Sequence, residues 1–166
     1  MRMKLDKKKE FRPSILDRLL DDEPEITVEA DKNRHQQMRE LHNSVRRDLQ
    51  NLLNTRYRII APPEEFKQLE NSLLNYGLPD LATVNIADSE KKKNFTRLLE
   101  KILRTYEPRF KAVKVMLQDN KDKTDRTLRF RIDATLYADP APEIVVFDSI
   151  LDPVSRTVNV EELRNG

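Results

Sequence analysis

The spacing of apolar residues changes near the middle of the chain. Up to Tyr106, apolar residues recur at intervals of three and four, which is the spacing of an amphipathic helix. Beyond Pro108 they recur at every second residue, as in a strand with one buried face. Pro108 enforces the change, because its ring cannot continue a helix and disfavours helical dihedral angles at Glu107. The sequence therefore predicts helices first and strands afterwards.

The first predicted helix is short and stands apart from the others. Its apolar face consists of Ile15, Leu16, Leu19 and Leu20. The acidic residues 21–25, which include a proline, are expected to form a linker after it. A helix this short is marginal alone and needs a surface, which is either its own domain or a partner. We divide the chain into residues 1–30, with a charged arm, this helix and the linker, and one domain of residues 31–166.

Three more helical patterns follow. The first has apolar residues at Met38, Leu41, Val45, Leu49, Leu52 and Leu53. Its other side, which includes Arg47 and Asp48, is expected to face solvent. The second pattern consists of Phe66, Leu69, Leu73 and Leu74. It predicts a helix that stops at Gly77, and the third pattern predicts a helix from residue 88 or 89 to about residue 105.

Gly77 is the only glycine before the final residue of the chain. Its place just after a predicted helix indicates a left-handed cap of the Schellman type. In that motif Leu78 would contact Leu73, and Pro79 would prevent the helix from continuing. With no other interior glycine, a glycine-rich loop that binds phosphate cannot be built.

Four strands are predicted after Pro108, over residues 111–118, 128–136, 144–147 and 156–160. The polar residues 119–126 between the first two strands predict a hairpin loop. The third strand is apolar on both faces, which suggests a more central position. We therefore predict an α+β fold, in which N-terminal helices pack on one face of a small, mostly antiparallel C-terminal sheet.

Composition excludes several classes of function. The 31 Lys and Arg residues nearly balance the 29 Asp and Glu residues, so no global charge favours nucleic acid or an anionic membrane. The lysine runs at 7–9 and 91–93 are expected to be solvated. The chain has no cysteine, which removes disulfides and thiolate chemistry. It shows no signal-peptide pattern and no apolar run of about 20 residues, so we expect a cytoplasmic protein without membrane insertion.

The sequence offers little support for a metal site or a nucleophilic active site. The two histidines, His35 and His42, are seven residues apart, whereas the helical two-histidine zinc motif needs a spacing of four with a glutamate between. We therefore expect ordinary surface histidines. No serine lies in a Gly-x-Ser-x-Gly turn. No cofactor is expected.

A glycosidase needs only two well-placed carboxylates, so that reaction is the alternative to a non-catalytic role. The candidate carboxylates are Glu107, Asp133, Asp139, Glu143 and Asp148. The chain has no tryptophan and few aromatic residues with which to build a sugar-stacking cleft. Arg109, two residues from Glu107, would favour a charged carboxylate there, which is the wrong state for a general acid. We therefore expect no enzyme.

Glu107 and Arg109 flank Pro108 at the change from helix to strand. One interpretation is an intramolecular salt bridge that locks this corner. The other is that the two side chains reach across an interface, since arginine suits a bidentate contact with a carboxylate. The residues alone leave both interpretations open.

Several short motifs occur together in a characteristic order. They are residues 12–20 (RPSILDRLL), 75–80 (NYGLPD), 107–109 (EPR), 139–143 (DPAPE) and 147–148 (FD). Over roughly residues 12–152 the chain resembles the TssE family, the small baseplate subunits of type VI secretion systems. That family belongs to the phage baseplate wedge proteins once labelled lysozyme-like.

The resemblance implies a structural role, with a muramidase of the lysozyme-like type as the alternative. It implies that the protein sits in the membrane-docked baseplate with TssF, TssG and TssK and helps to start the sheath of TssB and TssC. It favours the interface interpretation for Glu107, Pro108 and Arg109, because the family's Glu-Pro-Arg motif is associated with assembly on the sheath side. Strand addition at an edge of the sheet is the expected mechanism.

Overall fold

The structure is a computed structural model. It describes residues 14–20, 24–25, 33–56, 63, 65–79, 89–120, 125–138 and 141–163. The lysine-rich arm of residues 1–10 and most of the acidic linker lie outside these ranges. The division of the chain at residue 30 therefore stays a prediction.

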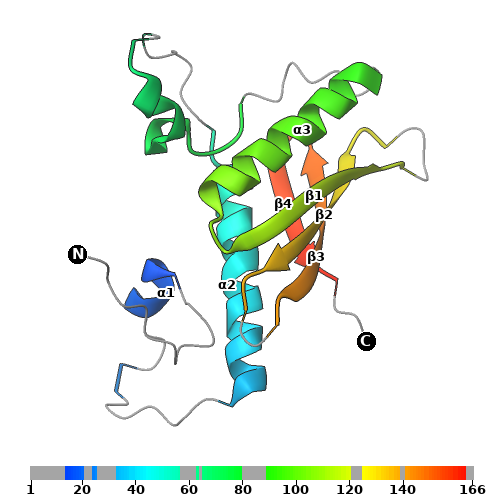
Figure 1. The fold of residues 1–166 in the computed structure, drawn as a ribbon. Helices are drawn as coiled ribbons and strands as arrows, with labels where there is room; N and C mark the ends of the chain where they lie inside the picture. Colours follow the sequence, from blue (N-terminus) through cyan, green and yellow to red (C-terminus); the bar gives the residue numbers. More distant parts are fainter. Residues whose placement is uncertain are drawn as a thin grey trace.

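Three α-helices lie where the apolar pattern predicts them (Figure 1). They are α1 (Ile15–Leu19), α2 (Arg34–Asn54) and α3 (Ser89–Tyr106). Reciprocal side-chain and backbone hydrogen bonds cap α1, between Ser14 and Asp17, and α2, between Asn33 and Gln36. Such capping boxes satisfy the free N–H groups of the first turn, which explains where these two helices start. The predicted cap of α3 at residue 88 lies outside the described residues.

The prediction of an α-helix between α2 and α3 is wrong. Two short 3-10 helices stand in its place, η1 (Lys67–Asn71) and η2 (Leu73–Asn75). Ser72 divides them, because its hydroxyl donates to the carbonyl of Leu69 and accepts from the N–H of Leu74. Leu73 is 84% exposed, so its burial contributes almost nothing that would favour a longer helix.

Gly77 has a φ of +109°, so a positive angle was correctly predicted, but the reason for it is different. Leu78 is buried in the core and Leu73 is exposed, so the expected contact between them is absent. Gly77 instead lies against the end of α2, where a Cβ atom would stand 2.4 Å from the carbonyl oxygen of Thr55. The N–H of Leu78 donates to that same oxygen at 2.8 Å. The glycine allows two chain segments to approach closely.

The strands form one antiparallel sheet in the order β1-β2-β3-β4. Their bounds are β1 (Phe110–Gln118), β2 (Leu128–Leu136), β3 (Glu143–Asp152) and β4 (Thr157–Glu162). All four predicted strands are present, and β3 is an inner strand, as predicted. The α+β fold class is confirmed.

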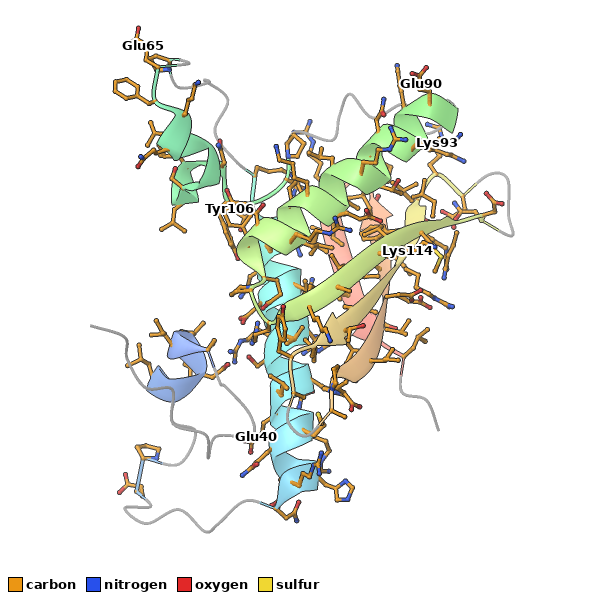
Figure 2. The ribbon with its side chains drawn as sticks, in the orientation of Figure 1. Glu40, Glu65, Glu90, Lys93, Tyr106 and Lys114 are labelled. Atoms are coloured by element: carbon orange, nitrogen blue, oxygen red, sulfur yellow. The ribbon has the colours of Figure 1, made fainter. Side chains whose placement is uncertain are left out.

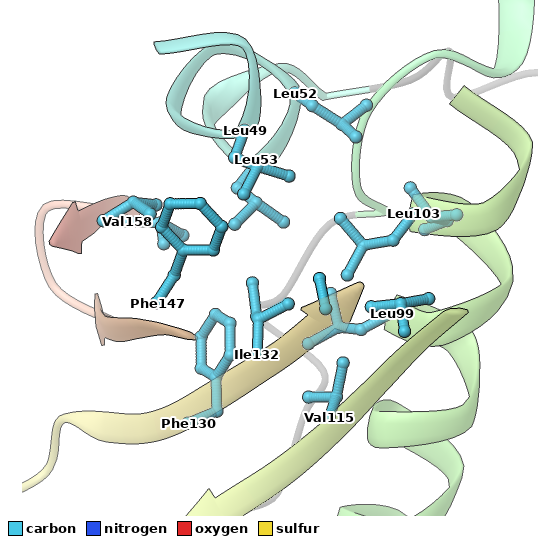
Figure 3. Close-up of a cluster of buried hydrophobic side chains, with 14 of the residues drawn as sticks. Leu49, Leu52, Leu53, Leu99, Leu103, Val115, Phe130, Ile132, Phe147 and Val158 are labelled. Carbon is cyan, nitrogen blue, oxygen red and sulfur yellow. The ribbon is translucent and has the colours of Figure 1, made fainter. Parts of the chain in front are cut away.

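One face of the sheet packs against α2 and α3, and Figure 3 shows the side chains that meet there. They include Leu49, Leu52 and Leu53 of α2, Leu99 and Leu103 of α3, and Val115, Phe130, Ile132, Phe147 and Val158 of the strands. Because strand residues alternate between faces, the opposite face carries the polar positions of the strands. We call it the open face, since none of the described helices packs on it. It carries Lys114, Arg131, Asp133, Asp148, Asn159 and Glu161.

Candidate protein-interaction site

A group of charged side chains joins α1, α2 and the corner between α3 and β1. It consists of Asp17 from α1, Ser44, Arg47 and Asp48 from α2, and Glu107 and Arg109 from the corner. We call it the Arg109 cluster. Ser44 and Glu107 are two of the three buried polar residues in the described part of the chain. Figure 2 labels Tyr106 at the end of α3, immediately before this corner.

Arg109 is the centre of the cluster. Its Nε and Nη2 atoms each donate at 2.6 Å to one carboxylate oxygen of Glu107. Its Nη2 also donates to Asp48 at 2.6 Å, and its Nη1 donates to the hydroxyl of Ser44 at 2.8 Å. Burial lowers the pKa of Arg109, but the hydrogen bonds and charges of Glu107 and Asp48 outweigh that effect and raise it. The guanidinium group is therefore permanently charged, and residues of both the corner and α2 hold it in place.

The internal salt bridge between Glu107 and Arg109 is therefore present. The side chain of Glu107 is 5% exposed and that of Arg109 is 14% exposed. The guanidinium group of Arg109 turns inward to the carboxylates of the corner and of α2. Pro108 itself is exposed. A role of this motif at an interface stays a prediction, and it would act through the surface of the corner.

Asp17 connects α1 to this cluster. Its carboxylate accepts a hydrogen bond from Ser44 at 2.5 Å, pairs with Arg47, and lies 3.8 Å from Nη1 of Arg109. Burial acts to raise the pKa of Asp17, but hydrogen bonds from Ser44, Ser14 and Arg47 outweigh it and lower the pKa to about 2. The charged carboxylate is thus strongly preferred in the docked helix.

The apolar face of α1 points away from the body of the protein. Ile15 is 79% exposed, Leu19 is 75% exposed, and Leu16 and Leu20 are about half exposed. Figure 1 shows α1 beside α2, on the side away from the strands. The sequence predicted that these four residues bury a surface, either within the domain or on a partner. In the described structure the polar side of α1 meets the body and its apolar face is exposed, so docking of this face on a partner stays a prediction.

Two aromatic rings line the neighbouring surface. Tyr76 and Tyr106 meet edge to face with ring centroids 5.3 Å apart. Burial raises the pKa of Tyr76, and the negative charges of Asp48 and Glu107 raise it further. The hydroxyl of Tyr106 donates to the carbonyl of Ser72 at 3.0 Å, which ties the segment before Gly77 to the corner.

The carboxylates considered for a glycosidase do not gather into one site. Glu107 is enclosed by the Arg109 cluster, whereas Asp133 and Asp148 lie on the open face of the sheet. Asp148 pairs there with Arg131 at 2.9 Å. Glu143 begins β3, and Asp139 lies outside the described residues. The described residues therefore offer no pair arranged around a common cleft.

The two histidines differ in environment. His35 is exposed, as predicted, but His42 is not an ordinary surface residue. Its Nδ1 atom lies 2.6 Å from a carboxylate oxygen of Glu162, and its side chain is only 16% exposed. Among the described residues no group of histidine and acidic side chains is arranged to hold a metal ion. In that same part of the chain, no helix combines the length and apolar character that a membrane crossing needs.

Sequence reasoning missed the α2 members of the Arg109 cluster, because Arg47 and Asp48 were expected to face solvent. One signal was available in hindsight. Ser44 and Asp48 are four residues apart, so they share one helix face and can hold one guanidinium group between them. Asp17 was hidden because the apolar stripe of α1 dominates the pattern of that segment.

Comparison with known proteins gives one family. The family model described as "Baseplate wedge protein gp25" matches residues 39–141, from α2 to just beyond β2. The match therefore covers most of α2, all of α3 and the corner with Glu107 and Arg109. Among curated proteins, no sequence matches this chain.

Proposed function

This chain belongs to the baseplate wedge protein gp25 family, and we propose that it is the TssE-type subunit of a type VI secretion baseplate. The family match supports a structural role in a baseplate. The proposal goes further in assigning it to a secretion apparatus at the cytoplasmic side of a membrane. There it would assemble with TssF, TssG and TssK and initiate the sheath of TssB and TssC. No catalytic step is part of this proposal.

The observation that carries the proposal is the orientation of α1. A helix that served only the fold would bury its leucines and expose its charges. Here Asp17 is bound by α2, while Ile15 and Leu19 are about three-quarters exposed. An amphipathic helix with a free apolar face fits into a hydrophobic groove of a partner, where residues of one face act as anchors. We infer that α1 is such an anchor within the baseplate.

The Glu-Pro-Arg motif supports the role of α1 as an anchor by holding the residues that bind it. Glu107 and Arg109 hold the corner, and Arg109 also organises Ser44, which binds Asp17. Loss of the motif would disturb both the corner and the contact between Ser44 and Asp17 that holds α1. We propose that α1 and the exposed Pro108 form one surface for the other baseplate subunits.

The test is a count of fluorescent sheaths in cells that carry the apparatus and lack their own copy of this gene. The double variant Ile15→Ser, Leu19→Ser is expected to melt at the wild-type temperature, because both side chains are exposed. We expect it to reduce sheath numbers at least tenfold. The matched control is Val154→Ser, which removes an apolar side chain that is 86% exposed on the β3–β4 turn.

Two results would contradict the proposal. One is a normal number of sheaths with the α1 double variant. The other is an equal loss with Val154→Ser, which would show that any exposed apolar residue matters. Affinity purification of the wild-type chain and the α1 variant, followed by mass spectrometry, identifies which baseplate subunits are lost.

A further inference from the structure

A row of positively charged side chains runs along the outer side of α3. It consists of Lys93, Arg97 and Lys101, which are spaced four residues apart and are all exposed. Residues at this spacing share one face of a helix and lie about 6 Å apart along its axis. Figure 2 labels Lys93 near the start of α3 and Tyr106 at its end, and the row runs from the first towards the second. We call these three residues the basic row.

The fold does not need the basic row. The opposite side of α3 holds this helix in place, since Phe95, Leu99 and Leu103 are buried in the core. Like charges four residues apart repel each other and destabilise a helix. In addition, Lys91 and Lys93 stand in the first turns of α3, where the positive end of the helix dipole disfavours cations. A helix face that is only solvated is better served by charges of both signs.

No acidic side chain among the described residues forms an ion pair with the basic row. Glu100, which follows the row on α3, is engaged elsewhere. Its carboxylate accepts a hydrogen bond from the N–H of Val115 at 3.0 Å and lies 3.7 Å from Arg104. A local arrangement that costs stability and has no compensating contact is expected at functional surfaces.

We propose that the basic row is a docking surface for an acidic helix of a partner protein, with a carboxylate at every fourth residue. Such a helix places its carboxylates about 6 Å apart, which is the spacing of the row. Arg97, at the centre of the row, can donate two parallel hydrogen bonds to one carboxylate. The partner's charges would also relieve the repulsion within the row. That the partner is a baseplate subunit rests on the proposed function, whereas the binding itself can be measured with the isolated protein.

Nucleic acid and membranes fit the basic row less well. The net charge of the chain is only +2, whereas a nucleic-acid-binding domain carries a broad basic excess. The aromatic residues of α3 are Phe95, which is buried, and Tyr106, which is half-buried, so this helix offers no exposed ring for base stacking. A helix that binds a membrane surface inserts its apolar face, but the apolar face of α3 is buried in the core. A single line of charges matches one helix of a protein.

The experiment measures binding of a fluorescein-labelled acidic peptide to the full chain by fluorescence anisotropy. The peptide is an alanine-rich helix of about 18 residues with a glutamate at every fourth position. The salt concentration is about 0.15 M, at which charges more than about 8 Å apart are largely screened. Three exposed ion pairs together contribute about tenfold to the affinity. We therefore expect Lys93→Gln, Arg97→Gln, Lys101→Gln to weaken binding about tenfold.

The matched control changes the net charge equally at three other exposed positions. It is Arg34→Gln, Lys111→Gln, Arg126→Gln, and it should bind the acidic peptide like the wild type. Glutamine has nearly the helix propensity of lysine and arginine, and its introduction into the row removes repulsion. The glutamine variant of the row should therefore melt at or above the wild-type temperature.

A charge swap makes the test specific. The variant Lys93→Glu, Arg97→Glu, Lys101→Glu should not bind the acidic peptide. It should bind a peptide with lysine in place of each glutamate about tenfold more tightly than the wild type does. This gain is not expected from a row that merely keeps the protein soluble.

Several results would overturn the proposal. They are equal affinity of the wild type and the glutamine variant of the row, an equal loss in the matched control, and no binding of the acidic peptide to the wild type. A melting temperature of the glutamine variant clearly below that of the wild type would show that the row serves the fold. Tighter binding of a DNA duplex of about 20 base pairs than of the peptide would assign the row to nucleic acid. None of these results bears on α1, so the proposed function would stand or fall separately by the sheath count.

Discussion

The core between the sheet and the helices and the Arg109 cluster, which binds α1, hold helices in opposite ways. In the core, α2 and α3 bury leucines such as Leu53 and Leu103 and expose their charges. At the Arg109 cluster, α1 is held by the carboxylate of Asp17, and its leucines are exposed. Apolar burial does not depend on a protonation state, whereas the hold of a single carboxylate on α1 is lost when that carboxylate takes up a proton. The comparison indicates a permanent body and a reversibly attached helix.

The largest expected effect lies in the core. Phe147→Ala removes a fully buried ring and should lower the free energy of unfolding by about 3–5 kcal/mol. Leu19→Ala, on the exposed face of α1, should change it by less than about 0.5 kcal/mol. Urea denaturation of both variants measures the contrast. A loss above about 2 kcal/mol for Leu19→Ala would show that the apolar face of α1 is buried in solution.

The next largest effect is expected at Arg109. Arg109→Ala leaves the buried carboxylate of Glu107 without its partner, so we expect a loss of about 2–4 kcal/mol. The loss of an exposed arginine would cost only about 0–1 kcal/mol. Arg97→Ala, at an exposed position of α3, is the control. Equal denaturation midpoints for the two variants would refute the structural role of Arg109.

Two buried serines, one in the Arg109 cluster and one in the core, extend this comparison to smaller expected changes in stability. Ser44 forms hydrogen bonds with two charged groups, whereas the hydroxyl of Ser149, 1% exposed inside the core, has no hydrogen-bond partner among the described residues. Ser44→Ala should cost about 1–2 kcal/mol, and Ser149→Ala should be neutral or raise stability by up to about 1 kcal/mol. Calorimetric melting of both variants tests this, and a reversed order of their melting temperatures would contradict it.

Much of the fold follows from the sequence, because burial imposes a period. Alternation predicted β1 and β2, a short run that is apolar on both faces predicted β3, and the apolar stripes predicted α2 and α3. The segment around Ser72 was mistaken for a helix, since its apolar residues have helical spacing but no surface to bury them. At the site, the motif of Glu107 and Arg109 was visible in the sequence. Its partners Ser44 and Asp48 were not visible, because the periodicity of a sequence indicates which residues are buried but not which polar side chains pair with one another.

Acid should release α1 only at a pH below the one at which ordinary carboxylates take up protons. The pKa of Asp17 is lowered from 3.8 to about 2 in the docked helix. A lowered pKa in the docked state means that docking is fully stabilised above about pH 4 and is lost as the pH falls through about 2. A fluorophore on Leu19→Cys reports this transition, since the chain has no other cysteine. Release near pH 5 or above would contradict the assignment to Asp17.

The most direct test of charge-held attachment is a distance measurement between α1 and the body. Nitroxide labels on Leu19→Cys and Lys101→Cys, both exposed positions, allow electron double-resonance spectroscopy of the isolated protein. We predict one narrow distance distribution in the wild-type background. Asp17→Ala should broaden it while leaving the melting temperature within a few degrees. An unchanged narrow distribution with Asp17→Ala would contradict the account, because α1 would then be held by something other than its carboxylate.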